Sequence, residues 1–107
     1  MESSQSFSAP PHGISPAALA GVRVVEMGQL IAGPFCGKTL GEFGADVIKI
    51  EAPETGDPLR NWRLIKEGTS VWWQVQSRNK RSVALDLRQK EGQAIARQLI
   101  AEADVLI

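Results

Sequence analysis

The sequence predicts a truncated α/β fold with an open, mainly parallel, Rossmann-like sheet and flanking helices. A β-branched run at 22–27 precedes a loop with glycine and proline, then a helical pattern, then a second strand pattern from Asp46. The order strand, helix, strand recurs over 82–107. Strands joined through helices form right-handed crossover units with parallel strands, so both halves of the chain predict one sheet.

The first unit spans Gly21–Glu51. After the strand at 22–27, residues 28–34 form a loop, because glycine and proline interrupt both regular periods. A helix is expected to begin at Pro34, where the missing N–H of proline costs nothing. It should end at Gly44, because glycine best tolerates the left-handed conformation that closes many helices. The second strand is Asp46–Glu51.

Three glycines at four-residue spacing, Gly33, Gly37 and Gly41, share one face of this helix. A face without side chains allows another backbone to approach closely. For Gly37 and Gly41 we favour close packing of helix against sheet over contact with a ligand. Gly33 differs, because it lies where a loop meets a helix N-terminus, beyond the carboxyl end of a strand, where open α/β sheets bind ligands.

The middle of the chain leaves one element open. Residues 69–77 suit a strand by β-branched and aromatic content, or a helix with Ser70 as its N-cap. In either case Trp72 and Trp73 point to different sides, so at least one should lie in the core.

The last unit contains the clearest helix. A strand is predicted at Ser82–Leu87, a helix at Gln89–Ala103 and a final strand at Asp104–Ile107. The helix pattern alternates an apolar stripe with charge at Ala94, Ile95, Gln98, Leu99 and Glu102. Because the chain stops at a strand, we expect an N-terminal fragment of a larger protein.

Composition excludes several classes of function. The 107 residues suffice for one domain, and 43% are hydrophobic. Twelve basic and twelve acidic residues balance, so net charge favours neither a nucleic-acid partner nor a membrane surface. One cysteine and one histidine exclude an internal disulfide, a cysteine-rich or two-histidine metal site and a Ser-His-Asp triad within this chain. Residues 1–20, rich in serine and proline, read as a flexible leader without targeting features, so a cytoplasmic location is expected.

Basic side chains offer two candidate anion sites. Residues 59–68 interleave basic residues with Trp62, which favours a solvated edge over a phosphate or base platform. Arg88 lies between the end of the strand at 82–87 and the start of the following helix, on the same sheet edge as the loop at 30–34. A phosphate there would meet a guanidinium and helix N–H groups together. From position alone, a solvent-facing arginine is an equal alternative.

Several blocks of the chain, in order and at matching spacing, resemble the N-terminal part of family III CoA-transferases. This group includes formyl-CoA transferase, carnitine CoA-transferase and 2-methylacyl-CoA racemase. The segments that carry the resemblance are LAGVRVVEM (19–27), LIAGP (30–34), LGEFGADVIKIEAPETGDPLR (40–60), NKRSVALDL (79–87) and EADVLI (102–107).

The resemblance implies that 21–107 is the N-terminal part of a CoA-binding α/β domain. Full-length members are interlocked homodimers that move CoA from an acyl-CoA to a carboxylic acid through aspartyl intermediates, without a metal. It further implies which residues contact CoA: the loop Leu30, Ile31, Ala32 and Gly33 beside the thioester and pantetheine arm, and the strand end Leu85, Asp86, Leu87 and Arg88.

Three departures from the family pattern qualify these expectations. Ile31 replaces the glutamine of formyl-CoA transferases, which argues against formate–oxalate specificity. Ala52 stands where a phosphate-binding arginine can occur, and Arg60 or Lys80 is the expected substitute. The catalytic aspartate of the family lies beyond Ile107, so we assign no catalytic residue here. The racemase branch and a non-catalytic nucleotide-binding module remain the alternatives.

Overall fold

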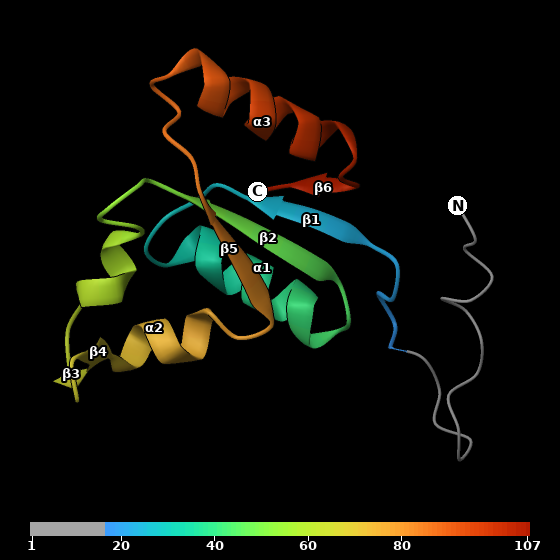
Figure 1. Ribbon diagram of the computed structural model, residues 1–107. Helices are drawn as coiled ribbons and strands as arrows, with labels where there is room; N and C mark the ends of the chain where they lie inside the picture. Colours follow the sequence, from blue (N-terminus) through green and yellow to red (C-terminus); the bar gives the residue numbers. More distant parts are fainter. Residues whose placement is uncertain (1–16) are drawn as a thin grey trace.

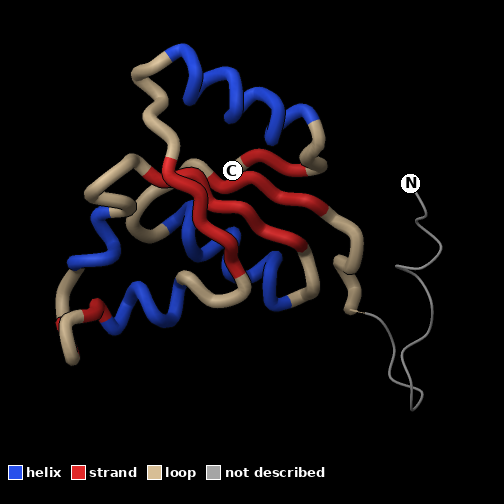
Figure 2. Tube along the Cα trace, in the orientation of Figure 1, coloured by secondary structure: helices blue, strands red, loops and turns tan. Residues whose placement is uncertain are grey.

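The computed structural model describes residues 17–107 and contains a four-stranded parallel sheet in the order β5-β2-β1-β6. The strands are β1 (Arg23–Glu26), β2 (Asp46–Glu51), β5 (Lys80–Ala84) and β6 (Val105–Leu106). The open parallel α/β class is therefore confirmed (Figure 1, Figure 2). The predicted leader, 1–20, lies outside the described residues except for 17–20, where a turn leads into β1.

Helices cover the two faces of this sheet. Helix α1 (Ala32–Glu42) connects β1 to β2 on one face, and α3 (Lys90–Ala101) connects β5 to β6 on the other (Figure 1). Successive residues of β1 serve opposite faces. Val24 packs with Leu40 on the α1 side, whereas Val25 packs with Ala96 on the α3 side.

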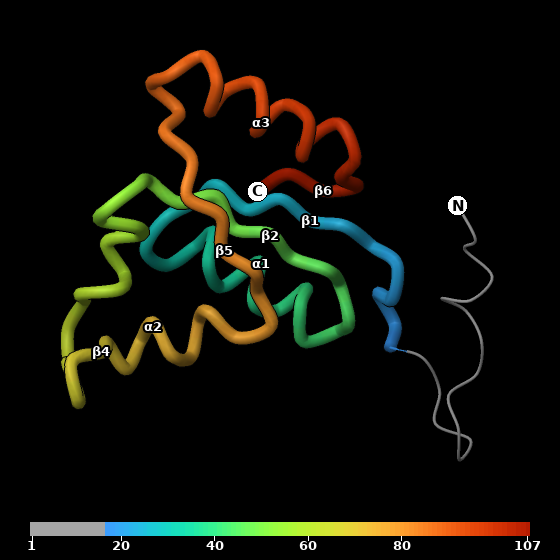
Figure 3. Tube along the Cα trace, viewed as in Figure 1, coloured from blue at the N-terminus to red at the C-terminus, as the bar shows by residue number. Residues whose placement is uncertain are grey.

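The connection after β5 reverses the direction of strand addition. Figure 3 shows the chain leaving β5, running through α3 and returning to β6 on the far side of β1. In chain order, β1, β2 and β5 are thus added side by side in one direction, whereas β6 pairs with the other edge of β1. The reversal is the topological switch point of doubly wound folds, where ligands bind beyond the carboxyl ends of the strands.

Helix α1 begins two residues before the predicted Pro34 and ends at Glu42, followed by Gly44 in the left-handed region (φ 106°). Close packing at its glycines is confirmed. A Cβ on Gly37 would lie 1.8 Å from Glu26 Oε1, and one on Gly41 would lie 3.3 Å from the Cβ of Asn79. The glycine face therefore lets α1 approach the sheet and its polar interior.

Residues 69–77 adopt the helical alternative over most of their length. An antiparallel hairpin of β3 (Ile65–Lys66) and β4 (Thr69–Ser70) follows a 3-10 helix, η3 (Pro58–Asn61), and leads into α2 (Val71–Gln76). Ser70 caps α2 by accepting a hydrogen bond from the Trp73 N–H, at 3.2 Å.

The expectation that Trp72 or Trp73 enters the core is wrong. Trp72 is 38% exposed and packs edge-on against Trp62, with ring centroids 5.4 Å apart. Trp73 is half-buried beneath the guanidinium of Arg60. The reason is that α2 packs on η3, β4 and α1 rather than on the sheet.

The predicted stripe of the last helix is also wrong in part. Gly92 and Ala96 are the buried residues of α3, whereas Ile95 is 44% exposed. Gly92 lies against the backbone of Asp86, where an added Cβ would come within 2.1 Å of the carbonyl oxygen. This contact turns the 92/96 face of the helix toward the sheet. In addition, β5 ends at Ala84, so the predicted strand end is irregular at 85–86 and passes into a turn at 87–88.

Candidate functional site: a pocket at the carboxyl edge of the sheet

A pocket of about 500 Å³ lies where β1, β2 and β5 end. Three loops enclose it, one after each of these strands. Its lining contains all four residues of the predicted strand end, Leu85, Asp86, Leu87 and Arg88. The other lining residues are Met27, Gln29, Ile50, Glu51, Ala52, Pro53, Glu54 and Thr55. The pocket therefore occupies the position at which parallel α/β sheets bind ligands.

Arg88 provides the cationic group of this pocket. Its side chain is 88% exposed, with Nε 3.0 Å from Asp86 Oδ1 and Nη2 3.3 Å from Asp86 Oδ2. The side-chain hydrogen bond lowers the pKa of Asp86 and raises the pKa of Arg88, so both groups are charged at neutral pH. The guanidinium is thus oriented by a carboxylate and remains accessible to an anion.

The loop after β1 reaches the pocket only through its first part. Met27 and Gln29 line the pocket, whereas the predicted residues Leu30, Ile31, Ala32 and Gly33 lie beside it and outside its lining. Leu30 has a positive φ of 66°, and its N–H donates to Asp57 Oδ1 at 3.0 Å. Within residues 17–107, the amides of Ala32 and Gly33 find no acceptor. These amides open the first turn of α1, where N–H groups are available to a ligand.

Arg60 lies at a smaller neighbouring hollow of about 210 Å³. Its guanidinium makes two hydrogen bonds of 2.8 Å to the carboxylate of Glu51 and stacks 4.0 Å from the ring centre of Trp73. Burial raises the pKa of Glu51, but hydrogen bonds from Arg60, Ser82 and the Asp57 N–H outweigh it and lower this pKa to about 2. Arg60 is therefore already neutralised by a partner within the chain.

Lys80 lines neither hollow. Its side chain is 3% exposed, with Nζ 2.7 Å from Glu26 Oε1 and 2.8 Å from the Pro34 carbonyl oxygen. Burial lowers the pKa of this ammonium group, and the carboxylate of Glu26 opposes that effect. The structure thus separates Lys80 from the pocket that Arg88 serves.

Sequence reasoning missed three further buried charges, Glu26, Lys49 and Asp57. Lys49 Nζ lies 2.7 Å from Glu26 Oε2 and 2.8 Å from Asp57 Oδ2. For Glu26 and Lys49 the available signal was a charged residue inside a pattern that reads as a buried strand, whereas Asp57 lies in a loop before η3. Among residues 17–107 there is no group of three or more histidine, cysteine or acidic side chains arranged to hold a metal ion.

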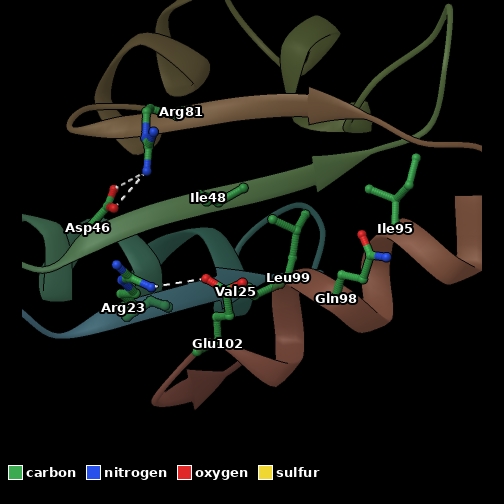
Figure 4. A pocket seen from close by; sticks show the side chains of 11 residues that line it. Arg23, Val25, Asp46, Ile48, Arg81, Ile95, Gln98, Leu99 and Glu102 are labelled. Atoms are coloured by element: carbon green, nitrogen blue, oxygen red, sulfur yellow. Dashed lines mark hydrogen bonds and ion pairs between the residues drawn. The ribbon is translucent and has the colours of Figure 1, made fainter. Parts of the chain in front are cut away.

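A third hollow, of about 330 Å³, lies between α3 and the sheet (Figure 4). Two ion pairs lie at its rim, Arg23–Glu102 and Arg81–Asp46. Arg23 and Asp46 are the first residues of β1 and β2, and Arg81 is the second residue of β5. It therefore lies toward the amino ends of the strands. The carboxyl-edge pocket is the better candidate, because ligands of open α/β sheets bind at carboxyl ends.

These features define a Rossmann-like α/β protein with a pocket beyond its parallel strands, lined by Arg88 and by the carboxylates of Glu51, Glu54 and Asp86. Residues 19–107 match CoA-transferase family III over most of the chain. The chain belongs to this family.

Relatives and solved structures agree with this assignment. The chain is 48% identical over 93 residues to a succinyl-CoA–D-citramalate CoA-transferase of Chloroflexus aurantiacus, covering 86% of this chain and 23% of that protein. It is 38% identical to a human succinyl-CoA:glutarate CoA-transferase, covering 83% and 20%. A CaiB/BaiF family protein from Brucella suis superimposes with a TM-score of 0.77 at 42% identity, covering 86% and 25%. The chain therefore spans about a quarter of the length of these proteins.

Proposed function

We propose that this chain is the CoA-binding N-terminal part of an enzyme that moves CoA from an acyl-CoA to a carboxylic acid. The observation that carries the proposal is the pocket at the carboxyl edge. It is lined by the Leu-Asp-Leu-Arg segment at 85–88 that resembles the family's, and the arginine of this segment is accessible to solvent. The related proteins with assigned reactions are named as CoA-transferases, which favours transfer over the racemase alternative.

In this proposal the pocket holds the nucleotide end of CoA, and Leu85, Asp86, Leu87 and Arg88 form its binding surface. Arg88 would pair with a phosphate group, since a guanidinium offers several donors in a fixed geometry. The acyl end would extend toward Leu30, Ile31, Ala32 and Gly33. There the unpaired amides of Ala32 and Gly33 could donate to a thioester carbonyl.

Arg60 and Lys80 take an indirect part in this proposal. Both cations pair with carboxylates and are less exposed than Arg88: the side chain of Arg60, paired with Glu51, is 39% exposed, and that of Lys80, paired with Glu26, is 3% exposed. We assign them to shaping the loops around CoA rather than to pairing with its phosphates.

The proposed reaction needs a carboxylate nucleophile that splits one acyl transfer into easier steps. By family resemblance that aspartate lies outside these 107 residues, so the chain supplies binding groups only. The whole enzyme is proposed to be a cytoplasmic homodimer. Among residues 17–107, no helix combines the length and apolar character that a bilayer crossing requires.

The test is a transfer assay on the full-length protein and on the 107-residue chain. With succinyl-CoA as donor and citramalate, malate or glutarate as acceptor, we expect the full-length protein to form the new CoA thioester. The 107-residue chain should form none, because it lacks the nucleophile. Transfer by the short chain, or thioester racemisation without transfer by the full-length protein, would overturn the assignment.

A further inference from the structure

Four buried charged side chains form a network beneath the loop at 28–34: Glu26, Lys49, Asp57 and Lys80. None is more than 3% exposed, and none lines any of the three hollows described above. Two are carboxylates and two are ammonium groups, so the network is neutral as a unit. Lys49 bridges Glu26 to Asp57, and Lys80 contacts the second oxygen of Glu26 at 2.7 Å.

The network holds the 28–34 loop, whose last three residues form the start of α1, at its first residue, in its middle and at its last residue. Lys49 Nζ donates to the Gly28 carbonyl oxygen at 3.0 Å. Asp57 Oδ1 accepts from the Leu30 N–H at 3.0 Å. Lys80 Nζ donates to the Pro34 carbonyl oxygen at 2.8 Å. Three of the four members therefore bind the backbone of one seven-residue loop.

The hydrogen bond from the Leu30 N–H to Asp57 fixes an unfavourable backbone conformation at Leu30. Leu30 adopts a φ of 66°, a region that residues with a Cβ rarely occupy and that persists only when the surroundings determine it. The hydrogen bond to Asp57 supplies such a constraint, and Asp57 is itself held by Lys49. Strain of this kind gathers at functional sites.

Stability alone is a poor reason for such a network. Well-packed apolar residues often replace buried ion pairs without loss of stability, but apolar residues could not bond the Gly28 and Pro34 carbonyls or the Leu30 amide. We propose that Glu26, Lys49, Asp57 and Lys80 are positioning residues that set the geometry of the 28–34 loop and thereby control turnover. This inference rests on the proposed function, because it assumes that the loop adjoins the thioester.

The test uses two variants of the full-length enzyme. Lys80→Met removes the donor to Pro34 and leaves the network with one excess negative charge. The double variant Lys80→Met/Glu26→Gln restores neutrality but still offers no donor to Pro34. We expect the single variant to lose both melting temperature and kcat, and the double variant to recover melting temperature only. The kcat loss should be about ten- to hundredfold in both, the scale of a misplaced reacting group, with KM for acyl-CoA nearly unchanged.

Arg81→Met is the matched control, since Arg81 follows Lys80 in β5 and pairs with Asp46 at the surface. It should change neither kcat nor melting temperature appreciably. Recovery of kcat together with melting temperature in the double variant would show a purely structural role and overturn the inference. So would a normal kcat in a Lys80→Met protein whose melting temperature is lowered.

Hydrogen exchange provides a readout independent of activity. The Phe35 amide shares a peptide unit with the Pro34 carbonyl and donates to the Ile31 carbonyl at 2.8 Å. Its exchange should accelerate about tenfold or more in both Lys80 variants, whether or not the protein transfers CoA. Unchanged protection would overturn the positioning role, whereas absence of transfer in the parent enzyme would overturn only the proposed function.

Discussion

Replacing Ala32 by valine in the full-length enzyme is expected to lower kcat about 10²–10³-fold, the cost of losing one donor to a developing oxyanion. Ala32 is exposed at the start of α1, and its amide has no acceptor within residues 17–107. Two added methyl groups would therefore leave the fold intact but obstruct the approach of a thioester to this amide and that of Gly33. Steady-state kinetics with succinyl-CoA measures the effect.

Leu30→Met is the control for this prediction. It replaces one side chain that is unbranched at Cβ by another in the same loop, and it keeps the backbone N–H that donates a hydrogen bond to Asp57. Turnover should therefore remain close to that of the parent. Circular dichroism and thermal melting verify that both variants fold. A near-parental kcat for a normally folded Ala32→Val protein would show that the loop does not face the reacting thioester.

Gly37→Ala is expected to destabilise the fold by about 3–5 kcal/mol, the usual cost of disrupting a buried ion pair. A Cβ at this position would lie 1.8 Å from Glu26 Oε1. That carboxylate cannot simply turn aside, because Lys49 and Lys80 hold its two oxygens in the interior. Denaturant unfolding of the full-length protein measures the loss.

Gly41→Ala is the matched control, four residues along the same helix face. Its added Cβ would meet Asn79 Cβ at 3.3 Å, a contact that a small shift relieves. Alanine also gains about 1 kcal/mol of helix propensity over glycine. The free energy of unfolding should therefore change little. Equal losses for both variants would mean that the whole glycine face, rather than the Glu26 carboxylate alone, limits how closely α1 can pack on the sheet.

The order of elements was predictable because its signals are local. The β-branched runs, the break that opens at Gly28 and the closing Gly44 each act within a few residues, and all appear in the structure, although α1 begins at Ala32 inside the predicted loop. The face of α3 was not predictable in this way. Its orientation depends on a contact between Gly92 and the Asp86 backbone, which no helical periodicity encodes.

The candidate site was likewise predictable only in part. Residues 85–88, which the family resemblance predicted to contact CoA, line the pocket, because they directly follow β5 at the carboxyl edge of the sheet. The ion network and its contacts join residues far apart in sequence: Lys49 follows Glu26 by 23 positions, and Lys80 follows Pro34 by 46. The family resemblance offered Lys80 as a substitute for a phosphate-binding arginine, whereas in the structure its ammonium group contacts Glu26 and the Pro34 carbonyl.

The central claim is that CoA lies at the carboxyl edge of the sheet with its phosphates near Arg88. Its most direct test is the Kd for CoA, and for a pantetheine analogue without nucleotide phosphates, in Arg88→Ala and Arg81→Ala forms of the full-length protein. A charge-assisted hydrogen bond contributes about 1.5–3 kcal/mol, so Arg88→Ala should weaken CoA about ten- to hundredfold and leave the analogue unaffected. Arg81→Ala, in the groove beside α3, should change neither Kd. Equal losses of both ligands in Arg88→Ala, or a loss of CoA confined to Arg81→Ala, would contradict the claim.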